Sequence, residues 1–356
     1  MNHGTSMALI VLVVWALGSS ACHGPDEPVD REASKAAQTS QHSSPQPQIV
    51  AVDAVKMGTR FDIQVAHHDQ AAAASAIDAA YEEIDRLEEL LSEWREDSQI
   101  SEVNRQAGQG PLSVGPELLE VVTRALELSQ LTDGAFDITF ATCGHLWSVG
   151  QQRIPSEQEI ADCLPHIDYR NVVVDQEEST IELIGERTRI GIGAIGKGYG
   201  VDRAAQVLSD RGIDDFIVDG GGDLRASGQR FGRPWRAAIA HPRSPDEFLA
   251  VVELWDRSFV TSGDYERYFE SDGVRYHHII DPATARPARA SIATTVIADD
   301  TTTADALSTA FFVLGPTEAL AIAGDLPGVE VLLVTADMEV HQTPGMENYL
   351  IDDRRR

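Results

Sequence analysis

Lys197 stands among five glycines in the segment Gly191–Asp202, which reads GIGAIGKGYGVD. Because glycine lacks a Cβ atom, this backbone could approach a ligand closely. Apolar residues continue at helical spacing from Val201 to Leu208, and the first N–H groups of the helix that they predict would favour an anion. The segment therefore indicates either a phosphate site with Lys197 as its cation or tight packing of the chain.

A carboxylate and a hydroxyl group, on Asp305 and Thr309, are four residues apart in TTTADALSTAFFVLG. On a helix they would lie one turn apart on the same face. Oxygen ligands of this kind suit Mg²⁺, which usually takes its other contacts from water and substrate phosphates. The alternative is that Asp305 caps the helix and Thr309 bonds to the previous turn.

Two adjacent histidines, His277 and His278, precede a turn predicted at Asp281 and Pro282. Neighbouring residues of a strand face opposite ways, so only one of the two imidazoles can belong to a shared site. An imidazole has an ordinary pKa near ~6.5 and suits a general base. The alternative is a pair of surface histidines.

Four aspartates flank glycine-rich turns in the segments TDGAFDITF and VDGGGDLRASG, namely Asp133, Asp137, Asp219 and Asp223. They could bind hydroxyl groups or cations, or they could hold the turns. Trp94 offers a flat surface on which a planar ring could stack, unless it belongs to the core.

A mixture of strands and helices must position these residues. Residues 49–66 alternate apolar and polar side chains around Met57, Gly58 and Thr59, which predicts a bent strand or a hairpin. Strands outnumber helices and do not alternate strictly with them, so the predicted fold class is α+β. Helices are expected over residues 71–91, 116–131, 197–211, 303–314 and 317–323, and strands over residues 171–174, 180–184, 216–219, 235–239, 250–254, 276–280, 292–298 and 329–335.

The composition is strongly acidic, with 28 Lys and Arg against 57 Asp and Glu and a formal net charge of −29. No basic stripe is present, which argues against a nucleic-acid partner. An anionic ligand must therefore be met by local groups such as one lysine, a helix N-terminus or a metal ion.

The N-terminal residues predict export. An apolar run from Met7 to Leu17 is too short to span a bilayer and is followed by small residues before Cys22, which is typical of a bacterial lipoprotein signal. We therefore expect a signal peptide over residues 1–22 and a tether rich in Ser, Pro and Gln over residues 23–47. The signal ends in a lipid anchor at Cys22 or, as the alternative, is removed by plain cleavage. Cys143 and Cys163 could form a disulfide or remain two buried thiols.

Taken together and in this order, the segments resemble the ApbE family, the FAD:protein FMN transferases. The resemblance runs from about Val50 to Leu350. It rests on eight motifs: MGTRF at Met57–Phe61; Ser98, Ile100 and Asn104; DGAFD at Asp133–Asp137; GAIGKGYGVD at Gly193–Asp202; GGD at Gly221–Asp223; TSGDYER at Thr261–Arg267; HIIDP at His278–Pro282; and ADALSTA at Ala304–Ala310.

The resemblance implies a single α+β domain over residues 48–351, with a T-fold-like core of mostly antiparallel sheets and packed helices. It also implies a location on the periplasmic side of a bacterial membrane. Members of the family bind FAD and Mg²⁺ and transfer FMN through a phosphoester bond to a Ser or Thr of a flavoprotein subunit, releasing AMP.

Carried onto this chain, the resemblance implies His278 as the general base, and a metal on Asp305, Thr309 and the backbone carbonyl of Ala194. Trp94 stands where many members have tyrosine, which preserves a stacking surface. The implied FAD contacts are Met57, Trp94, Ala135, Phe136, Asp137, Lys197 and Ile279.

Four positions depart from the family pattern. Ile138, Ala285 and Asp219 replace a proline, a glycine and an asparagine, whereas Gly191 replaces an aspartate close to the implied metal. Because that carboxylate is absent, two alternatives stay open. Water could replace the hydroxyl acceptor, which would make the protein an FAD pyrophosphatase, or the protein could bind flavin with little turnover.

Overall fold

The computed structural model describes residues 47–354. The predicted signal peptide, the Cys22 anchor and nearly all of the predicted tether lie outside the described residues. Within residues 47–354, no helix is both long and apolar enough to cross a membrane. The helices are α1 Gln70–Leu91, α2 Gln99–Arg105, α3 Pro116–Leu131, α4 Ala141–Gly144, α5 Glu157–Cys163, α6 Gly196–Asp210, α7 Thr301–Leu314 and α8 Pro316–Gly324.

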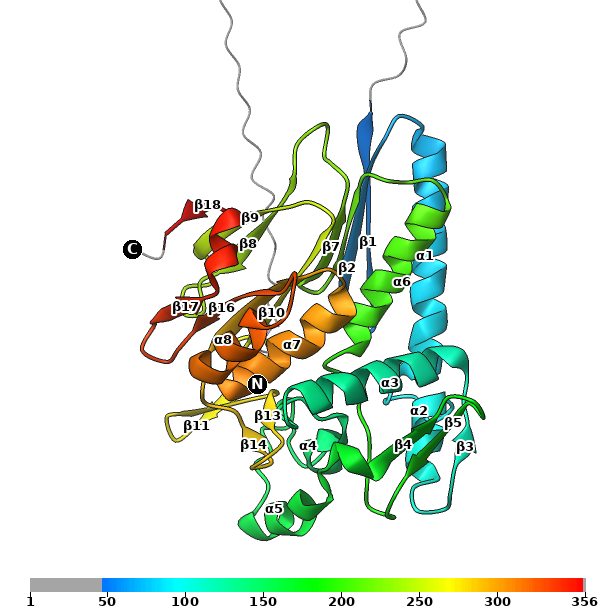
Figure 1. Ribbon diagram of the computed structural model, residues 1–356, viewed down its shortest axis with the longest axis vertical. Helices are drawn as coiled ribbons and strands as arrows, with labels where there is room; N and C mark the ends of the chain where they lie inside the picture. The colour runs from blue at the N-terminus through cyan, green and yellow to red at the C-terminus, as the bar shows by residue number, and fades with distance from the viewer. Residues whose placement is uncertain (1–46, 355–356) are drawn as a thin grey trace, which may run out of the picture.

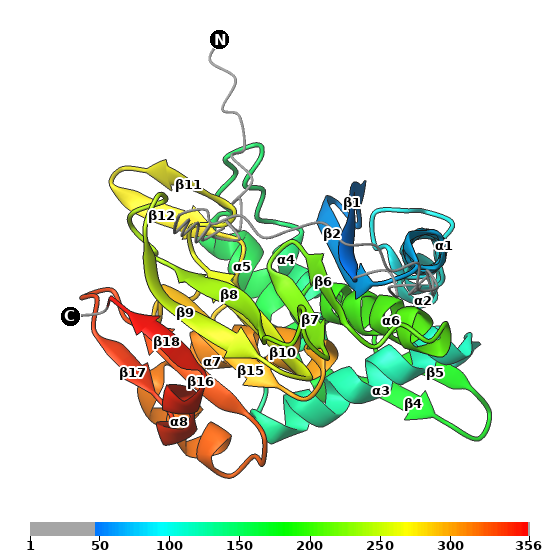
Figure 2. The ribbon, with the colours of Figure 1, turned by 90° about the horizontal axis from the view of Figure 1, so that it is seen from above.

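An eight-stranded antiparallel sheet with the order β1-β2-β6-β7-β10-β15-β16-β17 forms the centre of the molecule (Figure 2). Two three-stranded sheets, β18-β9-β8 and β3-β5-β4, and two short hairpins complete the fold. The strands are β1 Gln48–Lys56, β2 Thr59–His67, β3 Leu112–Ser113, β4 Val172–Asp175, β5 Thr180–Leu183, β6 Phe216–Gly220, β7 Asp223–Ser227, β8 Trp235–Ala240, β9 Phe248–Leu254, β10 Arg257–Gly263, β11 Tyr268–Ser271, β12 Val274–His277, β13 Ile280–Asp281, β14 Arg286–Pro287, β15 Ala293–Ala298, β16 Glu330–Val334, β17 Val340–Gln342 and β18 Leu350–Asp353.

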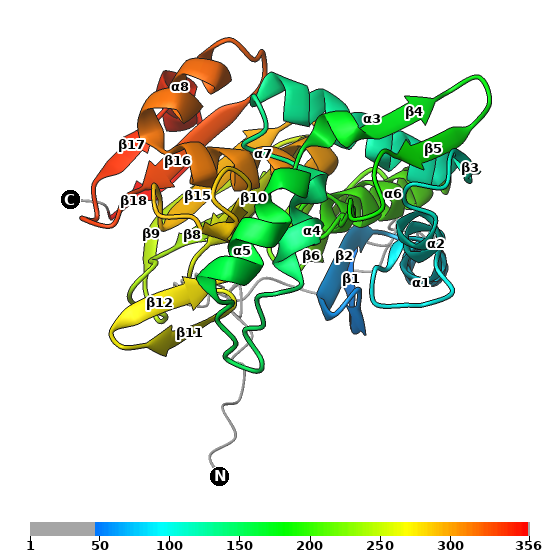
Figure 3. The ribbon, with the colours of Figure 1, turned by 90° about the horizontal axis from the view of Figure 1, so that it is seen from below.

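Strands β15 and β16 are buried on both faces, and β16 is accordingly a nearly continuous apolar run after Glu330. Val296 and Val331 pack with the helices in one core cluster. Their neighbours Ile297 and Leu332 pack with the β8-β9-β18 sheet in another. Because successive side chains of a strand alternate between its faces, the central sheet separates a helical layer from a second sheet. Seen from below, α7 and α8 lie in front of β15 and β16 (Figure 3).

Helices α1 and α6 run side by side along one end of the central sheet (Figure 1). Asp69 caps the N-terminus of α1, because its side chain accepts hydrogen bonds from the N–H groups of Ala71 and Ala72. Its buried stripe, which includes Ile77 and Ile84, packs with apolar residues of α6, β2 and β6. The predicted α+β class is therefore confirmed, and so are the predicted hairpin of β1 and β2 and the predicted helix over residues 71–91.

The prediction of one strand over residues 276–280 is wrong. Strand β12 ends at His277 and β13 begins at Ile280. The backbone N–H of His278 bonds to the carbonyl of Arg267 at 3.2 Å, while the carbonyl of Ile279 accepts from Ala288 at 3.0 Å. These two residues therefore connect separate hairpins and leave the strand before its predicted end.

Cys143 and Cys163 form a disulfide, which resolves the alternative that the sequence left open. The bridge joins α4 to the last residue of α5. Both cysteines pack in a small apolar cluster with Ile160 and Ala285. This cluster attaches the α4–α5 segment to the β13–β14 hairpin, which follows His278.

Candidate active site

The glycines before and within α6 allow close packing with α7. A Cβ atom at Gly198 would collide with the carbonyl of Thr301, and one at Gly200 would lie 2.9 Å from the Sδ atom of Met57. The N–H of Gly198 donates to Asp305 Oδ2 at 3.1 Å. This helix terminus therefore receives a carboxylate of the protein itself, so tight packing accounts for part of the glycine pattern.

Helices α6 and α7 exchange carboxylates where they meet. Asp202 of α6 accepts the N–H groups of Thr301 and Thr302 of α7, both at 2.8 Å, while Asp305 of α7 accepts from Gly198 of α6. Asp300, not Asp305, caps α7 by accepting the N–H of Thr303 at 2.6 Å. The alternative that Asp305 caps its own helix is therefore wrong, and its carboxylate faces the site.

Lys197 forms an ion pair with Asp223, and its Nζ atom lies 4.0 Å from Asp305 Oδ1. Burial alone would lower the pKa of Lys197, but the two carboxylates raise that pKa above its ordinary value, so the amine stays charged. Burial, and then the charge of Asp305, raises the pKa of Asp223 well above the ordinary value. When both are ionised, two carboxylates face one ammonium group, and such a site favours a further cation.

Hydroxyl groups continue this polar surface. Ser262 Oγ lies 2.7 Å from Ser308 Oγ and 3.4 Å from Thr309 Oγ1. Asp305 and Thr309, four residues apart, offer oxygen atoms from one face of α7, and the half-buried Ala194 belongs to the loop before α6. No cluster of three or more His, Cys, Asp or Glu side chains placed for a metal occurs in the described part of the chain. The oxygen donor set fits a hard cation that is bound jointly with a phosphate.

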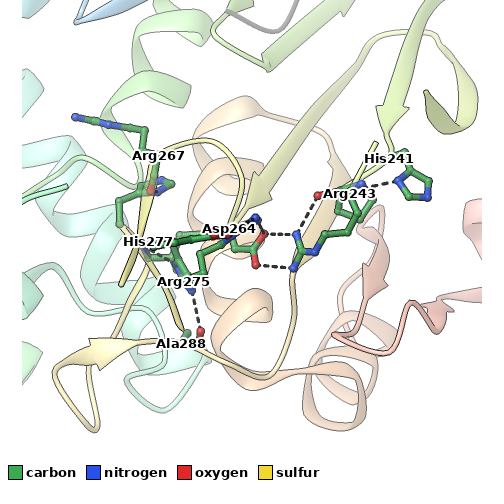
Figure 4. A network of polar contacts seen from close by, with 11 residues as sticks. His241, Arg243, Asp264, Arg267, Arg275, His277 and Ala288 are labelled. Carbon is green, nitrogen blue, oxygen red and sulfur yellow. Dashed lines mark hydrogen bonds and ion pairs between the residues drawn. The ribbon is translucent and has the colours of Figure 1, made fainter. Parts of the chain in front are cut away.

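The two histidines have different environments. His277 is 2% exposed, its Nε2 atom lies 2.9 Å from the carbonyl of Ala288, and its ring meets the ring of Phe312 edge-on. Because Nδ1 accepts the N–H of Ile279 at 3.3 Å, Nε2 carries the proton. Burial lowers the pKa of His277 to about 4. Figure 4 shows this ring pointing to Ala288, with Arg243 forked onto Asp264 close by. His277 therefore belongs to the framework.

His278, by contrast, is exposed. Its Nδ1 atom lies 3.3 Å from the carbonyl of Arg267 and must donate a proton to it, which leaves the lone pair on Nε2. Desolvation by the neighbouring protein atoms, and then the positive charge of Arg267, lowers the pKa of the His278 ring below its ordinary value. The ring is thus neutral near pH 7, which is the form that a general base requires.

The remaining predicted FAD residues lie in three kinds of environment. Met57, Ala135 and Lys197 are half-buried, whereas Trp94 is 86% exposed and presents its ring to solvent. Phe136 and Ile279 are buried apolar residues.

Asp137 is buried, and its carboxylate accepts the N–H groups of Thr139 and Tyr169 at 2.7 and 2.8 Å. Its side chain is therefore occupied by hydrogen bonds within the protein.

The segments come together at the glycine loop before α6. The N–H of Gly191 donates to the carbonyl of Ile138 at 2.9 Å, which places the DGAFD segment beside this loop. The ion pair between Lys197 and Asp223 places the start of β7 beside this loop. The close approach of Gly200 to Met57 places the turn of the β1–β2 hairpin next to α6.

Sequence reasoning missed the structural role of Asp202 and the presence of Glu266, whose charge acts on Lys197. Asp202 follows Gly198 by four residues, and this helical spacing was the available signal.

Two cavities lie away from this chemistry. The larger, of about 1090 Å³, is lined by residues of α3 and α6 such as Glu120 and Arg203. The smaller, of about 290 Å³, lies on the side of His277 and Asp264. Neither Lys197 nor His278 lines these cavities, so cavity size does not locate the site.

The chain is similar to known proteins over most of its described length. The sequence model of the ApbE family matches residues 57–333. FAD:protein FMN transferases of Treponema pallidum and Vibrio cholerae are both 35% identical, over 77% and 75% of this chain and 82% of each relative. The crystal structure of the ApbE protein from Thermotoga maritima superposes with a TM-score of 0.79 at 33% identity, covering 86% of this chain and all of that one. This chain therefore belongs to the ApbE family.

Proposed function

We propose that this protein is an FAD:protein FMN transferase that moves FMN from FAD to a Ser or Thr of a flavoprotein subunit and releases AMP. The activity is named for relatives that are 35% identical to the chain. The observation that carries the proposal is the combination of Lys197, Asp305 and the exposed, neutral imidazole of His278. Lys197 supplies a positive charge for phosphate oxygens, and the same charge favours the neutral form of the His278 ring.

In the proposed reaction, the acceptor oxygen attacks the phosphorus atom of the FMN half of FAD. The new O–P bond replaces the P–O bond to AMP, which leaves with the bridging oxygen. Nε2 of His278 takes the proton of the acceptor hydroxyl. Lys197, held by Asp223, stabilises negative charge that develops on the diphosphate oxygens.

Mg²⁺ is part of the proposal. The carboxylate of Asp305, the hydroxyl of Thr309 and the carbonyl of Ala194 would hold the ion, and bound Mg²⁺ neutralises charge on the diphosphate. The excess of carboxylates around Lys197 supports this assignment, because it favours a cation beside the ammonium group.

The test is incubation of residues 47–354 with FAD, Mg²⁺ and a candidate flavoprotein subunit. We expect a covalent mass gain of FMN on the subunit, with AMP released in equal amount. Free FMN and AMP without a mass gain would instead identify an FAD pyrophosphatase. FAD that stays bound and unchanged would identify a flavin-binding protein without turnover. A subunit with its acceptor Ser or Thr replaced by Ala is the matched control.

We further propose that Cys22 carries a lipid anchor that holds the domain on the periplasmic side of a bacterial membrane. The apolar run before Cys22 supports this location, and the disulfide between Cys143 and Cys163 is compatible with an oxidising compartment. The full chain should fractionate with membranes, and a Cys22→Ser variant should not carry lipid. Recovery of the unlipidated wild-type chain in the soluble fraction would refute the anchor.

A further inference from the structure

Glu93 has an unusual environment next to the glycine loop. It follows the end of α1 by two residues and directly precedes the exposed Trp94. A Cβ atom at Gly191 would lie 2.6 Å from Glu93 Oε2, and one at Gly193 would lie 3.5 Å from Oε1. The carboxylate therefore lies along the loop, in space that any side chain at Gly191 would fill.

This carboxylate receives no hydrogen bond from the described part of the chain. Within residues 47–354 it forms neither a hydrogen bond nor an ion pair, although it is only partly exposed. The N–H of Gly191, which lies close by, donates to Ile138 instead. The positive charge of Arg189 favours the ionised form of Glu93, although the two side chains form no ion pair. An acceptor withdrawn from water without a donor costs free energy, so the fold gains nothing evident from Glu93.

The surroundings of Glu93 indicate what its missing donor is. Trp94, the next residue along the chain, is an exposed flat ring. Ile138, whose carbonyl accepts the N–H of Gly191, follows the DGAFD segment, and Ala194 leads into α6 and Lys197. Gly191 is buried while Gly193 is exposed, so the carboxylate lies where the loop opens to solvent. A molecule that extends between these segments would reach Glu93 with its own O–H or N–H groups.

We propose that Glu93 is a substrate-binding residue that accepts hydrogen bonds from the hydroxyl or ring N–H groups of the bound flavin dinucleotide. This inference rests on the proposed function, because it takes FAD as the ligand of the site. Glu93 thereby supplies, from a different segment, a carboxylate at the place where Gly191 has none. The absent side chain at Gly191 is what makes room for it.

The first test measures the dissociation constant of FAD by flavin fluorescence for the wild type, Glu93→Ala and Glu93→Gln. A hydrogen bond to a charged group predicts a roughly 10- to 100-fold weaker binding for Glu93→Ala. The thermal midpoint should not fall, because Glu93 forms no hydrogen bond or ion pair within residues 47–354. The control is Glu96→Ala, which removes an exposed glutamate of the same segment and should leave FAD affinity unchanged.

The second test moves the carboxylate between segments. Gly191→Asp should weaken FAD binding in the wild type, because its Cβ atom would meet Glu93 at 2.6 Å. In the Glu93→Ala background, the same substitution should strengthen FAD binding. Gly191→Ala in both backgrounds separates charge from crowding, since a Cβ atom at this position also lies 2.9 Å from the Cβ atom of Ala141.

A lowered thermal midpoint with unchanged FAD affinity in Glu93→Ala would overturn the inference and make Glu93 a structural residue. An equal loss of affinity from Gly191→Asp in both backgrounds would overturn the shared position of the two carboxylates. If the wild type binds FAD but transfers no FMN, the proposed function fails while the role of Glu93 in binding is still measured. A wild type that does not bind FAD would overturn both.

Discussion

The adjacent histidines allow a matched experiment, because one substitution at each position should give opposite results. His278→Ala removes an exposed ring whose Nε2 lone pair is free, so stability should change by no more than about 0.5 kcal/mol. The loss of a general base should slow FMN transfer by roughly 10²- to 10⁴-fold. His277→Ala removes a ring that is 2% exposed and should act mainly on stability.

The magnitude for His277→Ala follows from its contacts. The carbonyl of Ala288 loses its donor, which costs about 1–3 kcal/mol for a buried acceptor. The space left beside Phe312 adds roughly 2 kcal/mol, at the lower end for truncation of a buried side chain. The sum of about 3–5 kcal/mol should lower the thermal midpoint by roughly 5–8 °C for a domain of this size.

Both variants should be assayed for thermal unfolding and, well below the midpoint, for covalent FMN transfer to the acceptor subunit. His277→Gln, which retains a side-chain donor for Ala288, guards against loss of folding in the alanine variant. Transfer at the wild-type rate by His278→Ala, together with a stable but inactive His277→Ala, would refute the assignment of the two imidazoles.

Three other perturbations give independent tests. Asp305→Asn keeps an acceptor for the N–H of Gly198 but loses the charge, so it should fold and lose magnesium-dependent transfer, and a wild-type response to Mg²⁺ would exclude Asp305 as a ligand. Burial lowers the pKa of His277 from 6.5 to about 4 in the folded protein. The unfolded chain therefore binds this proton first, and the free energy of unfolding should decrease by about 3 kcal/mol as pH falls from about 6.5 to about 4. His277→Gln should lack this component in urea titrations across that range, and an equal slope in the variant would refute it. Cys143 and Cys163 are 20 residues apart, so replacing both with serine removes a constraint worth about 3 kcal/mol. Limited proteolysis should then cleave first between α4 and α5, and unchanged protection would show that apolar packing alone holds this segment.

Local sequence patterns were enough for most secondary structure. The predicted helices over residues 71–91 and 116–131 differ from α1 and α3 by at most one residue at either end, because apolar residues at helical spacing form a continuous buried stripe in each. Strands β7 and β10 were missed, because they mix polar and small residues. Their backbone is held by antiparallel partners on both sides, which no local pattern reveals.

The sequence alone determined the family, the α+β class and the residue types of the site, because motifs and periodicity are properties of neighbouring residues. Only the tertiary structure decided which groups face one another. Asp305 does not cap its own helix and instead accepts the N–H of Gly198, and Cys143 pairs with Cys163. Glu93 lies against Gly191, although 98 positions of sequence separate them (191 − 93). Such contacts depend on how α1, α6 and α7 pack, and therefore on side-chain volumes distributed over the whole chain.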